Sequence, residues 1–199
     1  QLILKGDRAS LVDYGHRCCR ILHRNINTLG LPLLTIGLVQ GDALGGGLEA
    51  LLSFDFIISE ESASFGLPEI LFGLFPGMGA HAFLSRQLGS VAAEKLITSG
   101  KNLTAREMLA LGLVHDVVPD GTGEEAVQAF IEKNARRHAG LLGSRRAIKR
   151  SWNLSLAELT EITEIWADTA LKLTERDLKL MGRLASKQSR AVDKVREDA

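Results

Sequence analysis

The chain has 199 residues, of which 45% are hydrophobic, and its 24 basic residues balance 24 acidic ones. This length and apolar content suit a single domain with one sizeable core. A net charge of zero excludes the long-range positive field behind non-specific nucleic-acid binding. The longest strongly apolar stretch, residues 29–39, is too short to span a membrane, so we expect neither a nucleic-acid nor a membrane partner.

The first 60 residues alternate patterns typical of helices and strands. Apolar residues recur every three to four positions over residues 11–26, which predicts an amphipathic helix with Cys18 in its buried face. Residues 33–39 form a short apolar run that predicts a buried strand. Beyond a triple glycine, residues 47–53 predict a helix and residues 55–59 a second strand, so the unit is strand, glycine turn, helix, strand.

The rest of the sequence is mainly helical. Helical periodicity is present over residues 80–88, 91–98, 105–111, 124–137, 144–152 and 156–186. Thr104 and Glu107 form a capping box at the start of the third of these helices, and residues 114–118 predict a strand. We therefore predict the α/β fold class, with an α/β core over residues 1–120 and a helical C-terminal region of the same domain over residues 121–199.

Cysteine and histidine usage argues against a metal site. Cys18 and Cys19 are adjacent, which suits neither a disulfide framework nor metal binding. The five histidines have no metal-ligand spacing, so we expect no metal. Residues 1–10 lack the features of a secretory signal, which favours a cytoplasmic protein.

The segment GDALGGGLE, residues 41–49, is the first candidate for function. Consecutive glycines let the backbone turn sharply and approach a ligand closely. Free N–H groups at the start of the following helix, with its dipole, suit a developing negative charge such as a thioester enolate oxygen. Taken alone, the pattern is more often a tight strand-to-helix turn without chemistry.

Glu49 and Glu69 are the candidate acid and base. Both have apolar neighbours in the sequence, and partial burial would raise their carboxyl pKa values toward neutrality, as general acid–base catalysis requires. The alternative interpretation makes Glu49 a carboxylate that stabilises its own helix dipole and Glu69 a solvated turn residue.

Three stretches resemble the enoyl-CoA hydratase or crotonase superfamily in order and spacing: GDALGGGLE, FGLPEILFGLFPGMGA and LTAREMLALGLVHDVVP. The resemblance covers residues 33–119 closely and the helical tail loosely. It implies a crotonase-like repeated β-β-α spiral core, with C-terminal helices that mediate trimerisation. Homotrimers or dimers of trimers are therefore expected.

The same resemblance implies an acyl thioester substrate whose carbonyl is held by two backbone N–H groups, one of which matches Gly46. Glu49 and Glu69 match the two family glutamates that add or remove water next to the carbonyl. In the eliminating direction, Glu69 is expected to take the proton from the carbon beside the carbonyl and Glu49 to protonate the departing hydroxyl; the roles could be exchanged. No cofactor is implied beyond the coenzyme A or acyl carrier protein that bears the acyl group.

A narrower match is to the diffusible signal factor synthases, which make cis-2-unsaturated fatty-acid signals for bacterial quorum sensing. Residues 41–61, 64–84 and 175–190 carry it. It implies dehydration of a 3-hydroxyacyl group on acyl carrier protein, release by thioester hydrolysis, and a sensor or regulatory protein that restrains the enzyme. The positions that match substrate-binding residues are Leu44, Gly45, Met78, Trp166 and Leu184. Ordinary core packing is the alternative for the apolar four.

Three expectations remain open at this stage. Family members carry several strands before the equivalent of Leu33, including the loop with the second oxyanion donor, so we expect the chain to be N-terminally incomplete. A generic enoyl-CoA hydratase or isomerase and a non-catalytic crotonase-fold assembly module are the alternative functions. The basic run over residues 145–150 predicts a solvated helix face, or else a contact with an acidic carrier protein or a coenzyme phosphate.

Overall fold

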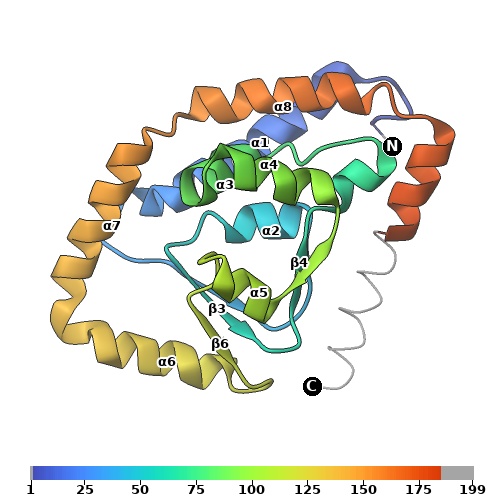
Figure 1. Cartoon of the computed structure of the whole chain (residues 1–199). Helices are drawn as coiled ribbons and strands as arrows, with labels where there is room; N and C mark the ends of the chain where they lie inside the picture. The colour runs from blue at the N-terminus through green and yellow to red at the C-terminus, as the bar shows by residue number, and fades with distance from the viewer. Residues whose placement is uncertain (1, 185–199) are drawn as a thin grey trace.

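The structure is a computed structural model that describes residues 2–184, and its strands form two small sheets (Figure 1). The strands are β1 (Ile36–Val39), β2 (Ala43–Leu44), β3 (Phe56–Glu60), β4 (Ser64–Gly66), β5 (Asn102–Thr104) and β6 (Asp116–Val118). One sheet has the order β1-β3-β6 and is entirely parallel. The other has the order β2-β4-β5, with β4 parallel to β2 and antiparallel to β5.

Helices surround these sheets. They are α1 (Arg8–Ile26), α2 (Gly46–Leu51), α3 (Ala80–Leu88), α4 (Ser90–Ser99), α5 (Ala105–Ala110), α6 (Gly123–Asn134), α7 (His138–Trp152) and α8 (Leu156–Ala170), with short 3-10 turns η1 (Thr28–Gly30), η2 (Pro68–Phe72) and η3 (Ala135–Arg137). Figure 1 shows α6, α7 and α8 as an outer frame around the core, with α1 beside α8. None of the helices in the described part of the chain is long and apolar enough to cross a membrane. The predicted α/β class with a helical C-terminal region is confirmed.

The main hydrophobic core lies between the sheets and the helices α2 to α5. Its largest fully buried side chains include Phe65, Phe83, Leu48 and Met108. A second cluster joins α1 and α8 to the end of η2 and the segment after it, where Phe72 and Leu74 are buried. Because α2 and the segment over residues 72–80 contribute to these clusters, packing fixes the two segments that carry the candidate site.

Helix α1 buries Cys19, whereas Cys18 is only partly buried, so the prediction that Cys18 belongs to the core was wrong. The buried positions Leu11, Gly15 and Cys19 are spaced by four, which sets the face that turns inward. Gly15 explains this choice of face. A Cβ there would collide with Cγ2 of Thr163, so α1 and α8 approach each other closely at this glycine.

The single long helix predicted over residues 156–186 is interrupted. α8 ends at Ala170, and a new helix begins at residue 175. Thr174 and Asp177 cap the second helix: the Thr174 N–H and hydroxyl donate to Oδ2 of Asp177 at 2.9 and 2.7 Å, and the Asp177 N–H donates to Oγ1 of Thr174 at 3.4 Å. This reciprocal cap starts a helix and so ends the previous one. Residues 185 and 186 lie outside the described residues.

Candidate active site

Glu49 lies in α2, in the first turn after the triple glycine, and only 1% of its surface is exposed. Its Oε1 accepts hydrogen bonds from the backbone N–H groups of Met78 at 2.8 Å and Ala80 at 3.0 Å. Ala80 begins α3 and Met78 lies two residues before it, so the Glu49 carboxylate of α2 caps the N-terminus of α3. The side chain is thus fixed at one oxygen.

The loop that holds Glu49 is itself held from a distance. Thr163, in the middle of α8, donates through Oγ1 to the carbonyl oxygen of Gly77 at 2.7 Å. The Cys19 thiol donates to the carbonyl oxygen of Met78 at 3.8 Å. Both side chains are fully buried. Sequence reasoning missed Thr163, because the residue lies 86 positions from the loop and no local motif marks it.

Glu69 also lies close to the glycine turn. It follows Pro68 at the start of η2, and its Oε2 is buried without a hydrogen-bond partner among the described residues. A Cβ on Gly45 would lie 2.8 Å from Oε1 of Glu69. Gly45 also has a φ of 56°, in the left-handed region. Glycine therefore serves two purposes at this position, the turn and the close approach of Glu69.

Both candidate carboxyls titrate near neutrality. Burial raises the pKa of Glu49 from 4.5 to about 7, against the hydrogen bonds from Ala80 and Met78, and the charge of Glu69 adds to the rise. Burial also raises the pKa of Glu69 from 4.5 to about 7. The charge of Glu69 disfavours ionisation of Glu49, which favours a state near pH 7 with one carboxyl protonated and the other ionised. Such a pair supplies an acid and a base together.

The structure brings most of the predicted site residues together. Gly46 begins α2, and a Cβ there would lie 2.6 Å from Cε of Met78. Its N–H belongs to the first turn, where no intrahelical acceptor exists. Leu44 precedes the glycines in β2, beside β4. A Cβ on Gly77 would lie 2.3 Å from Cγ of Trp166. The Trp166 side chain therefore packs against Gly77, the residue that precedes Met78.

Leu184 is less directly connected to the glutamates. Like Trp166, it packs against the second cluster, which contains Phe72 and Leu74. Its link to the site is therefore through that cluster and the loop over residues 76–79. A separate groove of about 780 Å³ runs along β1 and reaches Ala43 and Gly47; within residues 2–184, β1 has no strand partner on one side.

Substitution of Gly45 tests the geometry of the turn. Gly45→Ala places a methyl group 2.8 Å from Oε1 of Glu69 and strains the backbone at a φ of 56°. Because the methyl group would displace the Glu69 carboxyl, we expect catalytic activity to fall by about 100-fold or more. Gly47→Ala is the matched control, because nothing lies within 4 Å of a Cβ there. Steady-state kinetics of both variants checks this. Equal losses would contradict the close approach.

The raised pKa of Glu49 predicts how stability depends on pH. Between the ordinary pKa of 4.5 and the folded value of about 7, the folded chain retains a proton that the unfolded chain releases. Stability from this group is therefore full below pH 4.5 and decreases as pH rises toward 7, by about 3 kcal/mol. Glu49→Gln keeps the acceptor oxygen and cannot ionise. We expect it to be more stable than the wild type by this amount at pH 8.

Urea unfolding at pH 8 and at pH 4 checks this prediction. The two proteins should have nearly the same unfolding free energy at pH 4, because Glu49 is protonated in both the folded and the unfolded wild type near that pH. A stabilisation of the variant that is larger at pH 4 than at pH 8 would show that ionisation of Glu49 is not the cause.

Comparison with known proteins identifies a family for the chain. The enoyl-CoA hydratase/isomerase family matches the chain over residues 21–185. A probable enoyl-CoA hydratase of Rhizobium meliloti (strain 1021) is 42% identical over 124 residues, which are 62% of this chain and 48% of that protein. The 2,3-dehydroadipyl-CoA hydratase of Escherichia coli (strain K12) is 38% identical over 122 residues, covering 61% and 48%. The chain thus spans about half the length of the curated relatives it matches.

The fold agrees as well. The crystal structure of an enoyl-CoA hydratase from Mycobacterium avium subsp. paratuberculosis K-10 matches with a TM-score of 0.71 and 25% identity, covering 84% of this chain and 69% of that one. That of carnitinyl-CoA hydratase from Mycobacterium avium matches with a TM-score of 0.65 and 34% identity, covering 81% and 62%. From the family match over most of its length and the crotonase fold, the chain belongs to the enoyl-CoA hydratase/isomerase family.

Proposed function

We propose that this protein adds water to, or removes it from, the two carbons next to the carbonyl of an acyl thioester, with Glu49 and Glu69 as acid and base. The observation that carries the proposal is a pair of carboxyls, one in the helix after the glycine turn and one against Gly45, each with a pKa that burial raises to about 7. A dehydration needs a base for one carbon and an acid for the hydroxyl on the next, both active near neutral pH.

In the eliminating direction, we assign the first proton transfer to Glu69. Its carboxylate takes the proton from the carbon beside the carbonyl, and the electron pair moves toward the thioester oxygen. The N–H of Gly46 would stabilise that oxygen, as a preorganised donor does in other acyl enolate chemistry. Loss of the hydroxyl, protonated by Glu49, then completes the double bond. The reverse assignment of the two glutamates is the alternative.

The environment of each carboxyl favours this division. Oε1 of Glu49 is bound by two N–H groups, so the proton that it exchanges resides on Oε2, in a fixed position. Glu69 has an unpartnered, buried Oε2 among the described residues, so no donor there competes with a substrate proton for this oxygen. The first carboxyl is therefore suited to acid catalysis and the second to proton abstraction.

Within this chemistry, we propose the narrower role of a diffusible signal factor synthase. The substrate would be a 3-hydroxyacyl group on acyl carrier protein, and thioester hydrolysis by the same pair would release a cis-2-unsaturated acid. The sequences over residues 41–61 and 64–84 support this role. A generic hydratase acting on coenzyme A thioesters is the second candidate, supported by the names of the matched relatives. We propose that the acyl chain contacts Met78 and Trp166, which lie close to Gly46 and Gly77. We also propose that the protein is a cytoplasmic homotrimer and that a sensor protein controls it.

Mass spectrometry of the products separates these candidates. The protein is given 3-hydroxydodecanoyl groups on acyl carrier protein and on coenzyme A in parallel. Free unsaturated acid from the carrier-protein conjugate would support the signal synthase. Dehydrated coenzyme A thioester without free acid would support the generic hydratase. No turnover of either substrate by the folded protein would overturn both and leave a non-catalytic assembly module.

A further inference from the structure

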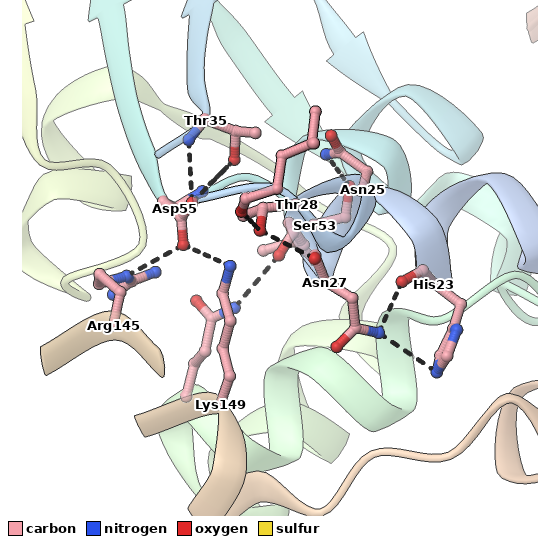
Figure 2. Close-up of polar contacts among 12 residues, drawn as sticks. His23, Asn25, Asn27, Thr28, Thr35, Ser53, Asp55, Arg145 and Lys149 are labelled. Carbon is pink, nitrogen blue, oxygen red and sulfur yellow. Dashed lines mark hydrogen bonds and ion pairs between the residues drawn. The ribbon is translucent and has the colours of Figure 1, made fainter. Parts of the chain in front are cut away.

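The basic run over residues 145–150 is not a uniformly solvated helix face. Arg145 and Lys149 of α7 turn inward, and their side chains are 19% and 13% exposed. Both meet Asp55, which is fully buried: its Oδ1 lies 3.3 Å from Nε of Arg145 and 2.5 Å from Nζ of Lys149 (Figure 2). Arg146 and Arg150 are exposed on the same helix.

Both carboxylate oxygens of Asp55 have partners. Its Oδ2 accepts hydrogen bonds from the N–H of Thr35 at 2.9 Å and from the Thr35 hydroxyl at 3.1 Å. Burial acts to raise the pKa of Asp55, but the contacts with Lys149, Thr35 and Arg145 outweigh it, and the pKa is lowered. The aspartate is thus ionised and contributes one negative charge.

This network forms one wall of a cavity of about 360 Å³, within the size range of small-ligand sites. The charged residues that line it are Asp55, Arg145, Arg146, Lys149 and Arg150. The cavity lining therefore carries four cations and one carboxylate. Two of those cations, Arg145 and Lys149, are mostly buried. Away from water an excess of positive charge is poorly screened, which favours a bound anion.

The backbone around the cavity is strained. Thr28 and Asn153 line it and have φ values of 51° and 47°, in the left-handed region, and Leu29 beside them has a φ of 56°. These are the non-glycine residues with positive φ in the described part of the chain. At Asn153 this conformation is an ordinary left-handed cap that ends α7, but the β-branched Thr28 rarely adopts it, and such strain concentrates at functional sites.

The cavity is separate from the candidate active site. Leu34 and Asp55 line it, and they stand two residues before β1 and one residue before β3, so it lies at the amino ends of these parallel strands. The Gly45 turn follows β1, and neither Glu49 nor Glu69 lines the cavity. A ligand there would not be the reacting acyl group.

We propose that this cavity binds a small phosphate-bearing anion, held by Lys149 and by the guanidinium groups of Arg146 and Arg150. A phosphate dianion balances the excess positive charge better than a single carboxylate does. Arginine forks also match its oxygens in pairs. This inference is independent of the proposed acid–base chemistry, and a catalytically inactive protein could still bind the anion.

Titration calorimetry of the full chain tests the proposal, with inorganic phosphate as the probe at constant ionic strength. Arg146→Gln combined with Arg150→Gln removes two lining cations without touching the buried Asp55 contacts. Arg136→Gln combined with Arg137→Gln is the matched control, because it removes the same charge from exposed residues of η3 that do not line the cavity.

We expect the first double variant to raise the Kd for phosphate by about 100-fold, roughly tenfold per charged contact, and the control to change it less than about twofold. No saturable binding by the wild type, or equal losses in both variants, would overturn the proposal. Coenzyme A is titrated alongside. If the first double variant also loses affinity for coenzyme A, the coenzyme is the source of the phosphate. If its affinity for coenzyme A is unchanged, the ligand is a free phosphate compound. Both outcomes apply when the phosphate titration supports the site.

Discussion

Replacement of Glu69 or Glu49 by glutamine is expected to lower kcat/KM for an enoyl thioester by about 100-fold to 10,000-fold in each case. Glutamine has almost the same shape, and at position 49 it can still accept the hydrogen bonds of Met78 and Ala80. The loss would therefore come from the missing proton transfer and not from a rearranged site. Absorbance of the enoyl thioester follows the reaction directly.

The pH profile of the wild type should be bell-shaped around pH 7. Below the pKa values of about 7, both Glu49 and Glu69 are protonated and no base remains. Above them both are ionised, and the acid is lost. Because the two charges interact, the limbs report the pair and not single residues.

A matched control is available in Glu94→Gln, on the exposed side of α4, which should leave kcat/KM and the profile unchanged. Circular dichroism confirms that each variant is folded. A folded Glu69→Gln protein with the activity and pH profile of the wild type would remove Glu69 from the mechanism.

Asp55→Asn is expected to reduce the free energy of unfolding by about 3–5 kcal/mol at pH 7. Asparagine can still accept the hydrogen bonds of Thr35, but it leaves Arg145 and Lys149 mostly buried without a negative partner. Because α7 is anchored to the amino end of β3 through these contacts, the loss should weaken the attachment of the helical frame to the sheet. Urea unfolding monitored by circular dichroism measures it.

The sign of the pH dependence gives a second check. The pKa of Asp55 is lowered in the folded chain, so its contribution is present above the unfolded pKa of 3.8 and is lost as pH falls through the folded value. The difference between wild type and Asp55→Asn should thus shrink in strong acid. Glu61→Gln, in an exposed pair with Arg106, is the control and should cost less than about 1 kcal/mol. Equal effects of the two substitutions would contradict a buried ion-pair network.

Local signals in the sequence were sufficient for the larger elements. The capping box of Thr104 and Glu107 begins α5 as predicted, and the three predicted strands form the parallel sheet as β1, β3 and β6. The second sheet was not predicted, because β2, β4 and β5 contain only two or three residues each, too few for a period to be seen. The cap formed by Thr174 and Asp177 was visible in the sequence and could have ended the preceding helix.

The candidate site was predictable only in part. Family motifs pointed to both glutamates and to Gly46, but the physical arguments for their proposed roles come from tertiary contacts. The N–H groups that fix Glu49 belong to Met78 and Ala80, and Thr163 of α8 holds their loop. The division of residues 145–150 into inward and outward cations likewise depends on Asp55, which no local pattern connects with α7.

Hydrogen exchange at the carbon beside the carbonyl tests the central claim most directly. A 3-hydroxyacyl thioester is incubated with the protein in deuterated water, and mass spectrometry follows deuterium at that carbon. We predict exchange by the wild type and a decrease of about 100-fold or more in Glu69→Gln, because that carboxylate takes the proton. Exchange by folded Glu69→Gln at the wild-type rate, with Glu49→Gln also unaffected, would contradict acid–base catalysis by this pair.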